Sequence, residues 1–582
     1  MYRAALRRGF QSTYDSMADR VRQEADGAAR ASAGLWSRQP STWSENPTVQ
    51  DAIANRLGWL DGPAFVMAQI PRLRRLADTV RHAGFAHVVL LGMGGSSLAP
   101  EVLRGIIGIP SGWPRLHVLD STDPAAVRAA TTPPLRTLYI LASKSGTTIE
   151  PNSLAAHFVR ELQQAGVGQW GDHFIAITDE GTELSRRAES EGFRDVFINP
   201  SDIGGRYSAL SFFGMVPAAL MGQDIGAIVG WGAAMLDVAR EPGDGAGAVT
   251  ENPAVGLGLL MAAGARAGRD KLTLVLPSAL EPFGLWVEQL VAESTGKFNI
   301  GVVPVTGETL GGPGVYGADR LFVRLRLTND PDEERQDTAM AALSATSRAP
   351  IVTLAFDEPA SLGAEFVRWE VATAVAGAIL GVNPFDEPNV KQAKDATGVL
   401  LSAYESDGAL PFRPPDRERI DGTTWALSST ARNSLADRPP EELLDLLGEG
   451  DYLGLLAYLG PDPALDHELH RFRMAVRDRT RIATTSGFGP RYLHSTGQLH
   501  KGGPNTGVFV LITATPTEDL DVPGVPYSFG TLELAQALGD FSSLDAAGRR
   551  ALHLHLPAPD ARLLRASLDA LLSEARKGPA SE

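Results

Sequence analysis

Short apolar runs alternate with helix-like stretches along most of this chain. The first series of runs lies at residues 87–92, 116–120, 138–143, 173–179 and 195–200. The first four runs lead into segments of helical character, and the fifth closes the series. Short apolar strands that alternate with helices predict a parallel sheet covered on both faces.

A second alternation follows, and the end of the chain shows a third. The second series has apolar runs at 271–277 and 351–357, with helices predicted over 283–295 and 364–380. After a polar stretch rich in Pro, Arg and Asp come further strand-like runs, of which the clearest are 507–514 and 551–557. The two larger halves are alike in layout, which is consistent with a duplicated fold.

These patterns predict an α/β protein with two doubly wound parallel-sheet domains and a smaller C-terminal α/β domain. The expected boundaries are a helical N-terminal segment at 1–60, a first sheet domain at 61–235, a second at 236–405, a connector at 406–440 and the C-terminal domain at 441–582.

Composition excludes several classes of protein. The 582 residues carry a formal net charge of −16, which is unlike a nucleic-acid binder. The absence of cysteine excludes disulfides, thiolate metal sites and a cysteine nucleophile. The longest nearly apolar stretch, residues 254–265, is shorter than the ~20 residues of a membrane span. Asp15 and Asp19 interrupt the N-terminus before an apolar core forms, so it does not read as a secretory signal. We therefore expect a soluble cytoplasmic protein.

A glycine-rich turn, GMGGSS at residues 92–97, follows the first predicted strand and opens a helix. At Gly94, Gly95 and Ser96 the backbone can approach an anion closely, and the helix offers free N–H groups. The turn matches no nucleotide-binding pattern, and a plain tight turn is the alternative interpretation.

A second turn, residues 143–148, concentrates hydroxyl groups at the end of another strand. Its members are Ser143, Lys144, Ser145, Gly146, Thr147 and Thr148. Hydroxyl and amide groups at such a place suit a phosphate monoester, whose terminal oxygens accept many hydrogen bonds. A hydroxyl-capped helix start is the alternative. Two such turns on neighbouring strands favour phosphate binding.

Several motifs together resemble one enzyme family. SKSGTTIE resembles the phosphosugar-binding signature of sugar isomerase domains, and GMGGSSLAPE resembles the glycine turn of glucose-6-phosphate isomerases. Segments 204–214, 287–297 and 383–394 are similar to the arginine, glutamate and lysine segments of that family. The C-terminal region, with RYLHSTGQLHKGGPNTG, most resembles the isomerase half of bifunctional transaldolase–phosphoglucose isomerases.

The resemblance implies sugar-isomerase domains that interconvert D-glucose 6-phosphate and D-fructose 6-phosphate, in glycolysis and gluconeogenesis. The reaction moves a proton between C1 and C2 through a cis-enediol and requires neither a metal ion nor an organic cofactor. The expected partner is a small sugar phosphate, with no nucleic acid or membrane, and the chain is a possible homodimer.

The resemblance also assigns roles to particular residues. Glu293 is the expected base, and Gln289, one helical turn earlier, helps to hold the sugar phosphate. Arg206 stabilises the enediolate, a role that suits a permanently charged planar donor. Lys394 contacts the ring oxygen during ring opening, whereas the nearby Lys391 is expected to be a surface residue.

The family also uses a histidine for ring opening, and the matching segment 307–323 contains none; Asp319 or Arg320 stands there instead. His494, in a context similar to the family's H-x-x-x-Q-L, is the candidate replacement. The C-terminal domain would bring it to the site by folding back or by reaching across a dimer. His500 and Lys501 are weaker candidates, and the alternative is that His494 only packs between domains.

Two other functions stay open on the sequence alone. A dual phosphoglucose/phosphomannose isomerase is one, because SKSGTT is close to the general sugar-isomerase consensus. A non-catalytic sugar-phosphate sensor on the same fold is the other. A sensor needs only the hydroxyl turns, so the presence of both Glu293 and Arg206 favours catalysis.

Overall fold

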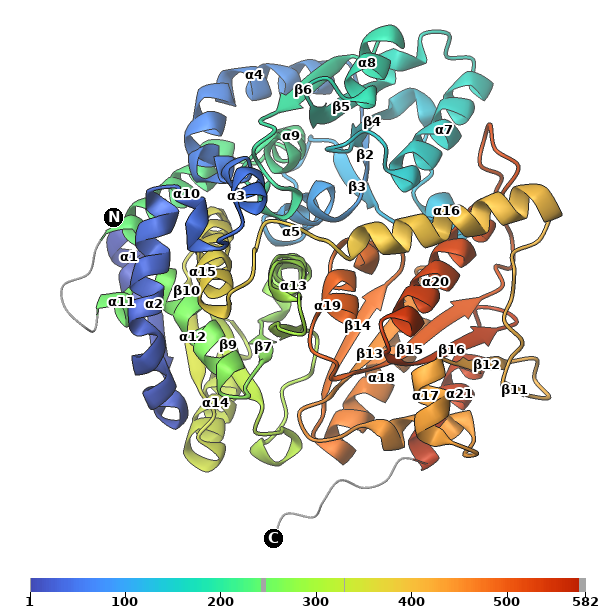
Figure 1. The fold of residues 1–582 in the computed structure, drawn as a ribbon. Coiled ribbons are helices and arrows are strands. Elements are labelled where there is room, and N and C mark those ends of the chain that lie inside the picture. Colours follow the sequence, from blue (N-terminus) through green and yellow to red (C-terminus); the bar gives the residue numbers. More distant parts are fainter. Residues whose placement is uncertain (1, 242–247, 329, 575–582) are drawn as a thin grey trace.

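The computed structural model describes residues 2–241, 248–328 and 330–574 (Figure 1). Within these ranges the strands form sheets of five, five and six strands. Helices surround each sheet, which confirms the predicted α/β class. No helix in the described ranges is long and apolar enough to cross a membrane.

The first sheet is entirely parallel, in the order β3-β2-β4-β5-β6. Its strands are β2 (His87–Gly92), β3 (Arg115–Leu119), β4 (Thr137–Ala142), β5 (Phe174–Asp179) and β6 (Asp195–Asn199). Both glycine- and hydroxyl-rich turns follow central strands, β2 and β4. Because parallel strands end at one edge of the sheet, the two turns share that edge.

The second sheet has the order β1-β10-β9-β7-β8, and only β1 is antiparallel to its neighbour. Its strands are β1 (Phe10–Thr13), β7 (Lys271–Val275), β8 (Val303–Val305), β9 (Arg320–Leu327) and β10 (Ile351–Phe356). The N-terminal segment was expected to be purely helical, and β1 corrects that expectation. This strand has four residues and gains its hydrogen bonds from a strand about 340 positions away, so local periodicity carries little trace of it.

The third sheet has the order β11-β12-β16-β15-β13-β14. Its strands are β11 (Arg417–Glu418), β12 (Thr424–Leu427), β13 (Tyr452–Tyr458), β14 (Ala483–Phe488), β15 (Gly507–Ala514) and β16 (Arg550–Leu556). The strands from β16 to β14 are parallel, whereas β11 and β12 run antiparallel at one edge. The stretch expected as a connector thus contributes β12, whose Trp425 is fully buried.

The helices fill the space around and between these sheets. Their bounds are α1 Tyr2–Arg8, α2 Ala18–Trp36, α3 Pro47–Ala54, α4 Gly62–His82, α5 Leu98–Ile106, α6 Pro124–Ala129, α7 Ile149–Gln164, α8 Glu183–Ser190, α9 Phe212–Leu220, α10 Ile225–Arg240, α11 Ala248–Glu251, α12 Val255–Arg266, α13 Glu281–Thr295, α14 Glu333–Ser347, α15 Leu362–Leu380, α16 Val390–Asp407, α17 Ser429–Leu435, α18 Pro463–Thr480, α19 Gly497–Gly502, α20 Phe529–Ala546 and α21 Ala561–Glu574.

Helix α16 crosses the molecule between the first sheet domain and the C-terminal domain, and it packs along α20 (Figure 1). Leu401 of α16 and Phe529 and Leu532 of α20 join the apolar core on one face of the first sheet. The C-terminal domain therefore shares buried surface with the first domain, and this docking is stabilised by burial of apolar side chains.

Helix α13 lies at the centre of the molecule and is buried on nearly every side. Phe283, Trp286 and Leu290 pack into the main core, which brings Glu288 and Glu293 into the interior with them. The helix ends before Gly296, where a Cβ atom would lie 2.5 Å from the Cα of Leu499 in α19. The glycine allows the C-terminal domain to approach the end of α13.

Candidate active site

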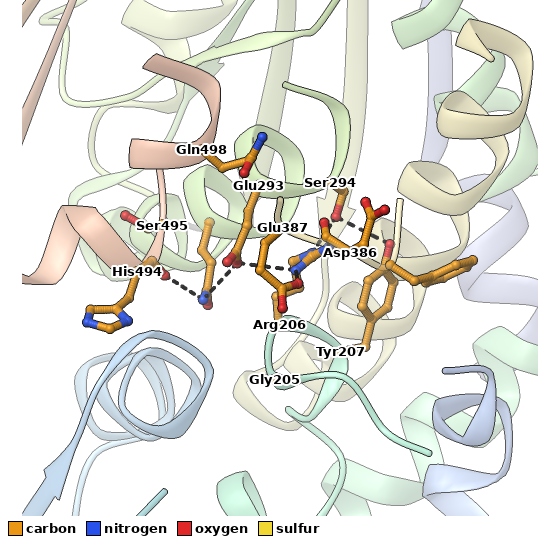
Figure 2. A network of polar contacts seen from close by, with 12 residues as sticks. Gly205, Arg206, Tyr207, Glu293, Ser294, Asp386, Glu387, His494, Ser495 and Gln498 are labelled. Atoms are coloured by element: carbon orange, nitrogen blue, oxygen red, sulfur yellow. Dashed lines mark hydrogen bonds and ion pairs between the residues drawn. The ribbon is translucent and has the colours of Figure 1, made fainter. Parts of the chain in front are cut away.

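A buried carboxylate and a buried guanidinium meet at the centre of the molecule (Figure 2). Glu293 comes from the last turn of α13, and Arg206 comes from a 3₁₀ turn, residues 205–207, between the first two domains. Their closest atoms, Glu293 Oε2 and Arg206 Nη1, are 3.5 Å apart. The structure brings together the residues that were expected to act as base and as enediolate stabiliser.

Hydrogen bonds fix the Arg206 guanidinium in place. Nε donates to Ser294 Oγ at 2.8 Å, and Nη2 donates to the carbonyl oxygens of Pro384 and Asp386, each at 2.8 Å. Nη1 donates to Glu387 Oε2 at 3.0 Å. The Nη1 end, between Glu293 and Glu387, is therefore the part of the cation that is turned toward the carboxylates.

Burial sets the electrostatics of this pair. Burial raises the pKa of Glu293 to about 7, the Arg206 cation opposes the rise, and Glu387 adds to it. Burial alone would lower the pKa of Arg206, but Glu293 and Glu387 raise it on balance, so the guanidinium stays charged. A carboxyl group with a pKa near neutrality can both accept and release a proton at working pH.

Gln289 links this pair to the C-terminal domain. Its Nε2 donates to the backbone oxygen of His494 at 2.7 Å and lies 3.3 Å from Glu293 Oε2. Gly94 lies against the same groups, with φ of +53°, and a Cβ there would lie 2.7 Å from both Gln289 Nε2 and the His494 oxygen. Only glycine fits this position.

The ring of His494 points away from Glu293 (Figure 2). His494 ends a 3₁₀ turn, residues 491–494, and its Nε2 lies 2.9 Å from Oε1 of Glu150, the second residue of α7. Burial would raise the pKa of Glu150, but His494 and Lys394 lower it on balance. An ionised carboxylate only accepts hydrogen bonds, so Nε2 carries the proton. Sequence reasoning missed Glu150, although it stands only two residues after the hydroxyl turn.

The hydroxyl turn presents only part of its polar groups. Ser145 and Thr147 are exposed, with their hydroxyl oxygens 3.1 Å apart, and Ser143 Oγ lies 3.1 Å from Thr148 Oγ1. Lys144 is held elsewhere: its Nζ donates to Asp179 at 2.5 Å and to the Ser201 carbonyl oxygen at 2.8 Å. The exposed hydroxyls and the backbone are thus the groups that are free to meet an anion.

A cavity of about 190 Å³ joins this turn to the C-terminal domain. Thr147, Thr148, Lys394 and His494 line it together with Glu150. Glu293, Arg206 and Gln289 are not among its lining residues. The bond from Gln289 to the His494 backbone connects the cavity with the buried ion pair.

The glycine turn lies beside the arginine segment. Gly95 approaches so closely that a Cβ there would lie 2.1 Å from the carbonyl oxygen of Gly205, next to Arg206. Ser96 is half-buried at the end of the same turn. The glycine turn therefore lies against the Arg206 segment, and the hydroxyl turn ends another strand at the same carboxyl edge of the first sheet.

The other candidates for ring opening lie outside the cavity. Arg320 is buried in an ion pair with Glu308, 3.0 Å apart, and Asp319 lies 3.8 Å from Lys271. His500 is buried, and burial lowers its pKa well below the usual value. Lys501 is also buried and pairs with Asp540 at 2.6 Å.

Lys391 forms a surface ion pair with Asp395 at 2.6 Å. A larger cavity of about 620 Å³, between α13, α18 and the end of β14, is lined by none of the sequence-predicted site residues. In the part of the chain that the structure describes, no group of three or more Asp, Glu or His side chains is placed to hold a metal ion.

Comparisons with known proteins show which family this chain is similar to. The family model described as phosphoglucose isomerase matches residues 70–318. A glucose-6-phosphate isomerase of Citrifermentans bemidjiense is 28% identical over 388 residues, which is 59% of this chain and 71% of the relative. One of Thermosynechococcus vestitus is 30% identical over 357 residues, 55% of this chain and 66% of the relative.

Two solved structures share the fold. A hypothetical protein of Thermus thermophilus superposes with a TM-score of 0.57 at 23% identity, over 67% of this chain and 99% of its own. A glucose-6-phosphate isomerase of Chlamydia trachomatis superposes with a TM-score of 0.51 at 17% identity, over 69% of this chain and 89% of its own.

Proposed function

This chain belongs to the phosphoglucose isomerase family, and we propose that it catalyses the reversible isomerisation of D-glucose 6-phosphate and D-fructose 6-phosphate. The observation that carries the proposal is the buried pair of Glu293 and Arg206. The Glu293 carboxyl group lies 3.5 Å from the Arg206 guanidinium, and burial raises the pKa of Glu293 to about 7. The reaction needs one group that removes a proton from one carbon and returns it to the next, next to a cation that stabilises the enediolate.

Glu293 carries the proton between C2 and C1. Near pH 7 about half of its population is ionised at a pKa of about 7, so removal and return of the proton are both accessible. Arg206 stabilises the oxygen on which negative charge develops, through its Nη1 end. Glu387 occupies that end with a side chain that is 46% exposed, so substrate oxygens can displace it.

Residues of the two turns, residues that line the 190 Å³ cavity, and Gln289, which bridges to that cavity, account for the other tasks. Ser96, Ser145, Thr147 and Thr148 bind the phosphate, and Gln289 and Lys394 contact the sugar. His494 exchanges the proton that opens the ring, with its Nε2 held by Glu150. The contact of His494 with Glu150 within one chain supports delivery of His494 by the folded-back C-terminal domain.

A coupled assay tests the proposal. Purified protein is given fructose 6-phosphate, formation of glucose 6-phosphate is followed, and Glu293→Gln is compared with Glu288→Gln. Glu288 is buried on the same helix with a pKa also raised to about 7 by burial, but it lies outside the Arg206 cluster. We expect Glu293→Gln to lose about 10²–10⁴-fold in kcat and Glu288→Gln to keep activity.

Two results would contradict the proposal. Equal activity of wild type and Glu293→Gln removes Glu293 as the base. A wild-type protein that binds fructose 6-phosphate in calorimetry without converting it is a sugar-phosphate sensor instead.

A further inference from the structure

A chain of buried hydrogen bonds leads from the first domain to the ring of His494. Thr122 Oγ1 donates to Gln536 Oε1 at 2.8 Å, and Gln536 Nε2 donates to Glu150 Oε1 at 2.8 Å. The same Glu150 oxygen lies 2.9 Å from His494 Nε2. Thr122 follows β3 and Gln536 lies in the middle of α20, so the chain joins the first and C-terminal domains.

Chemistry determines the direction of each bond. Gln536 can place either its oxygen or its nitrogen against Glu150, but an oxygen would face the carboxylate with no proton between them. The Thr122 hydroxyl meets the amide oxygen and so holds the nitrogen toward Glu150. Thr122 and Gln536 are both buried, with 0% and 2% of their surface exposed, so water cannot take over these bonds.

Glu150 depends on these donors. It is 3% exposed, and its second oxygen, Oε2, is buried without a hydrogen-bond partner among the described residues. Gln536 and His494 are the side-chain donors to Oε1. Without Gln536, the imidazole is the one side-chain donor among the described residues that is left to this buried carboxylate. A buried anion that loses a donor is costly.

We propose that Gln536 is a positioning residue for ring opening: it holds the Glu150 carboxylate against Nε2 of His494, with Thr122 orienting the Gln536 amide. Nε2 then keeps its proton, and Nδ1, which has no hydrogen-bond partner in the described ranges, is left for the substrate. This inference rests on the proposed function, in which His494 opens the sugar ring. It adds a role for α20, a helix of the C-terminal domain.

The loss of Gln536 shifts the titration of the pair in a definite direction. The form with Glu150 ionised and the ring neutral has the greatest need of the amide donor. Loss of the amide donor therefore destabilises this deprotonated form most, and the Glu150–His494 pair keeps its shared proton up to a higher pH. The other titratable groups facing the pair are Lys394 on α16, Glu293 on α13 and Tyr458 on β13. All of them stay unchanged in the test.

The test follows the imidazole of His494 directly by nitrogen NMR on protein with ¹⁵N-labelled histidine, without substrate; His494→Gln identifies its signals. In Gln536→Met, which keeps the length but removes the donor, we expect the midpoint to rise by about one pH unit. In the pH profile of kcat, the limb that reports the Glu150–His494 pair should shift by the same amount as the NMR midpoint. KM should change by less than twofold.

Matched variants separate this effect from general damage. Ser543→Ala removes another buried hydrogen bond of α20, to the Gly539 carbonyl oxygen at 2.8 Å, and should leave the midpoint unchanged. Thr122→Val should shift it in the same direction as Gln536→Met, and Thr122→Ser should restore it. If Gln536→Met does not fold, the comparison of Thr122→Val with Thr122→Ser provides the test.

An unchanged midpoint and an unchanged kcat profile in Gln536→Met, or in Thr122→Val when the former does not fold, overturn the proposal. Failure of the proposed function has a different signature. If His494→Ala keeps full turnover, ring opening does not use His494, and the NMR titration still reports whether Gln536 acts on the Glu150–His494 pair.

Discussion

Replacement of Glu293 by glutamine should make the stability of the protein less dependent on pH while it removes activity. In the unfolded chain a glutamic acid has a pKa near 4.5, and in the fold burial raises that of Glu293 to about 7. Between these values the folded chain binds the extra proton, so the stability from this group is lost as pH rises through 7. From pH 5 to pH 8 the loss is about 2–3 kcal/mol. Because a glutamine side chain cannot ionise, the Glu293→Gln variant does not undergo this loss of stability.

Urea unfolding at pH 5 and pH 8 measures this difference. The pH-independent cost of losing the Arg206 contact cancels, because each variant is compared with itself at two pH values. Glu288→Gln is the matched control: its carboxyl group has a similarly raised pKa, so its stability should respond to pH as that of Glu293→Gln does, with turnover retained. If Glu293→Gln loses as much stability as wild type between the two pH values, the carboxyl group does not carry a raised pKa and the reasoning is refuted.

Three further outcomes are expected. Glu387→Gln removes an anion that raises the pKa of Glu293, so the acid limb of the kcat/KM profile should move to lower pH by up to about one unit; a limb that stays in place contradicts the assigned electrostatics. Thr147→Ala removes a hydroxyl that lines the cavity, so KM for fructose 6-phosphate should rise about tenfold with kcat retained; an unchanged KM would place the phosphate elsewhere. Lys501→Met leaves Asp540 buried without its cation and should cost about 3–5 kcal/mol in urea unfolding, most of which the double variant with Asp540→Leu should recover.

The sequence predicts the sheets well where burial is continuous. The first sheet and most of the second consist of short apolar runs whose type and place local patterning reveals. Strands β1, at the edge of its sheet, and β12, next to the two-residue edge strand β11, escape prediction because both are short and pair with distant partners. Their sequences are neither continuously apolar nor long enough to show a period.

The candidate site divides in the same way. Glu293 and Arg206 were found because each lies in a motif that can be recognised along the chain, and the structure places them in contact. Glu150, Glu387 and Gln536 were missed because what marks them is proximity in space. Gln536 lies 386 positions from the carboxylate that it contacts, and a glutamine in the middle of a helix has no distinctive local pattern.

The docking of α20 and α16 against the first sheet has a consequence for synthesis of the chain. Domains generally fold as they leave the ribosome, so the two sheet domains with Glu293 and Arg206 can form while the C-terminal domain is still being made. Until the C-terminal domain has folded and docked, the Glu150 carboxylate lacks both His494 and Gln536. A nascent chain thus contains Glu293 and Arg206 before Glu150 has its partners, and isomerase activity is expected to begin only after the C-terminal domain has been made.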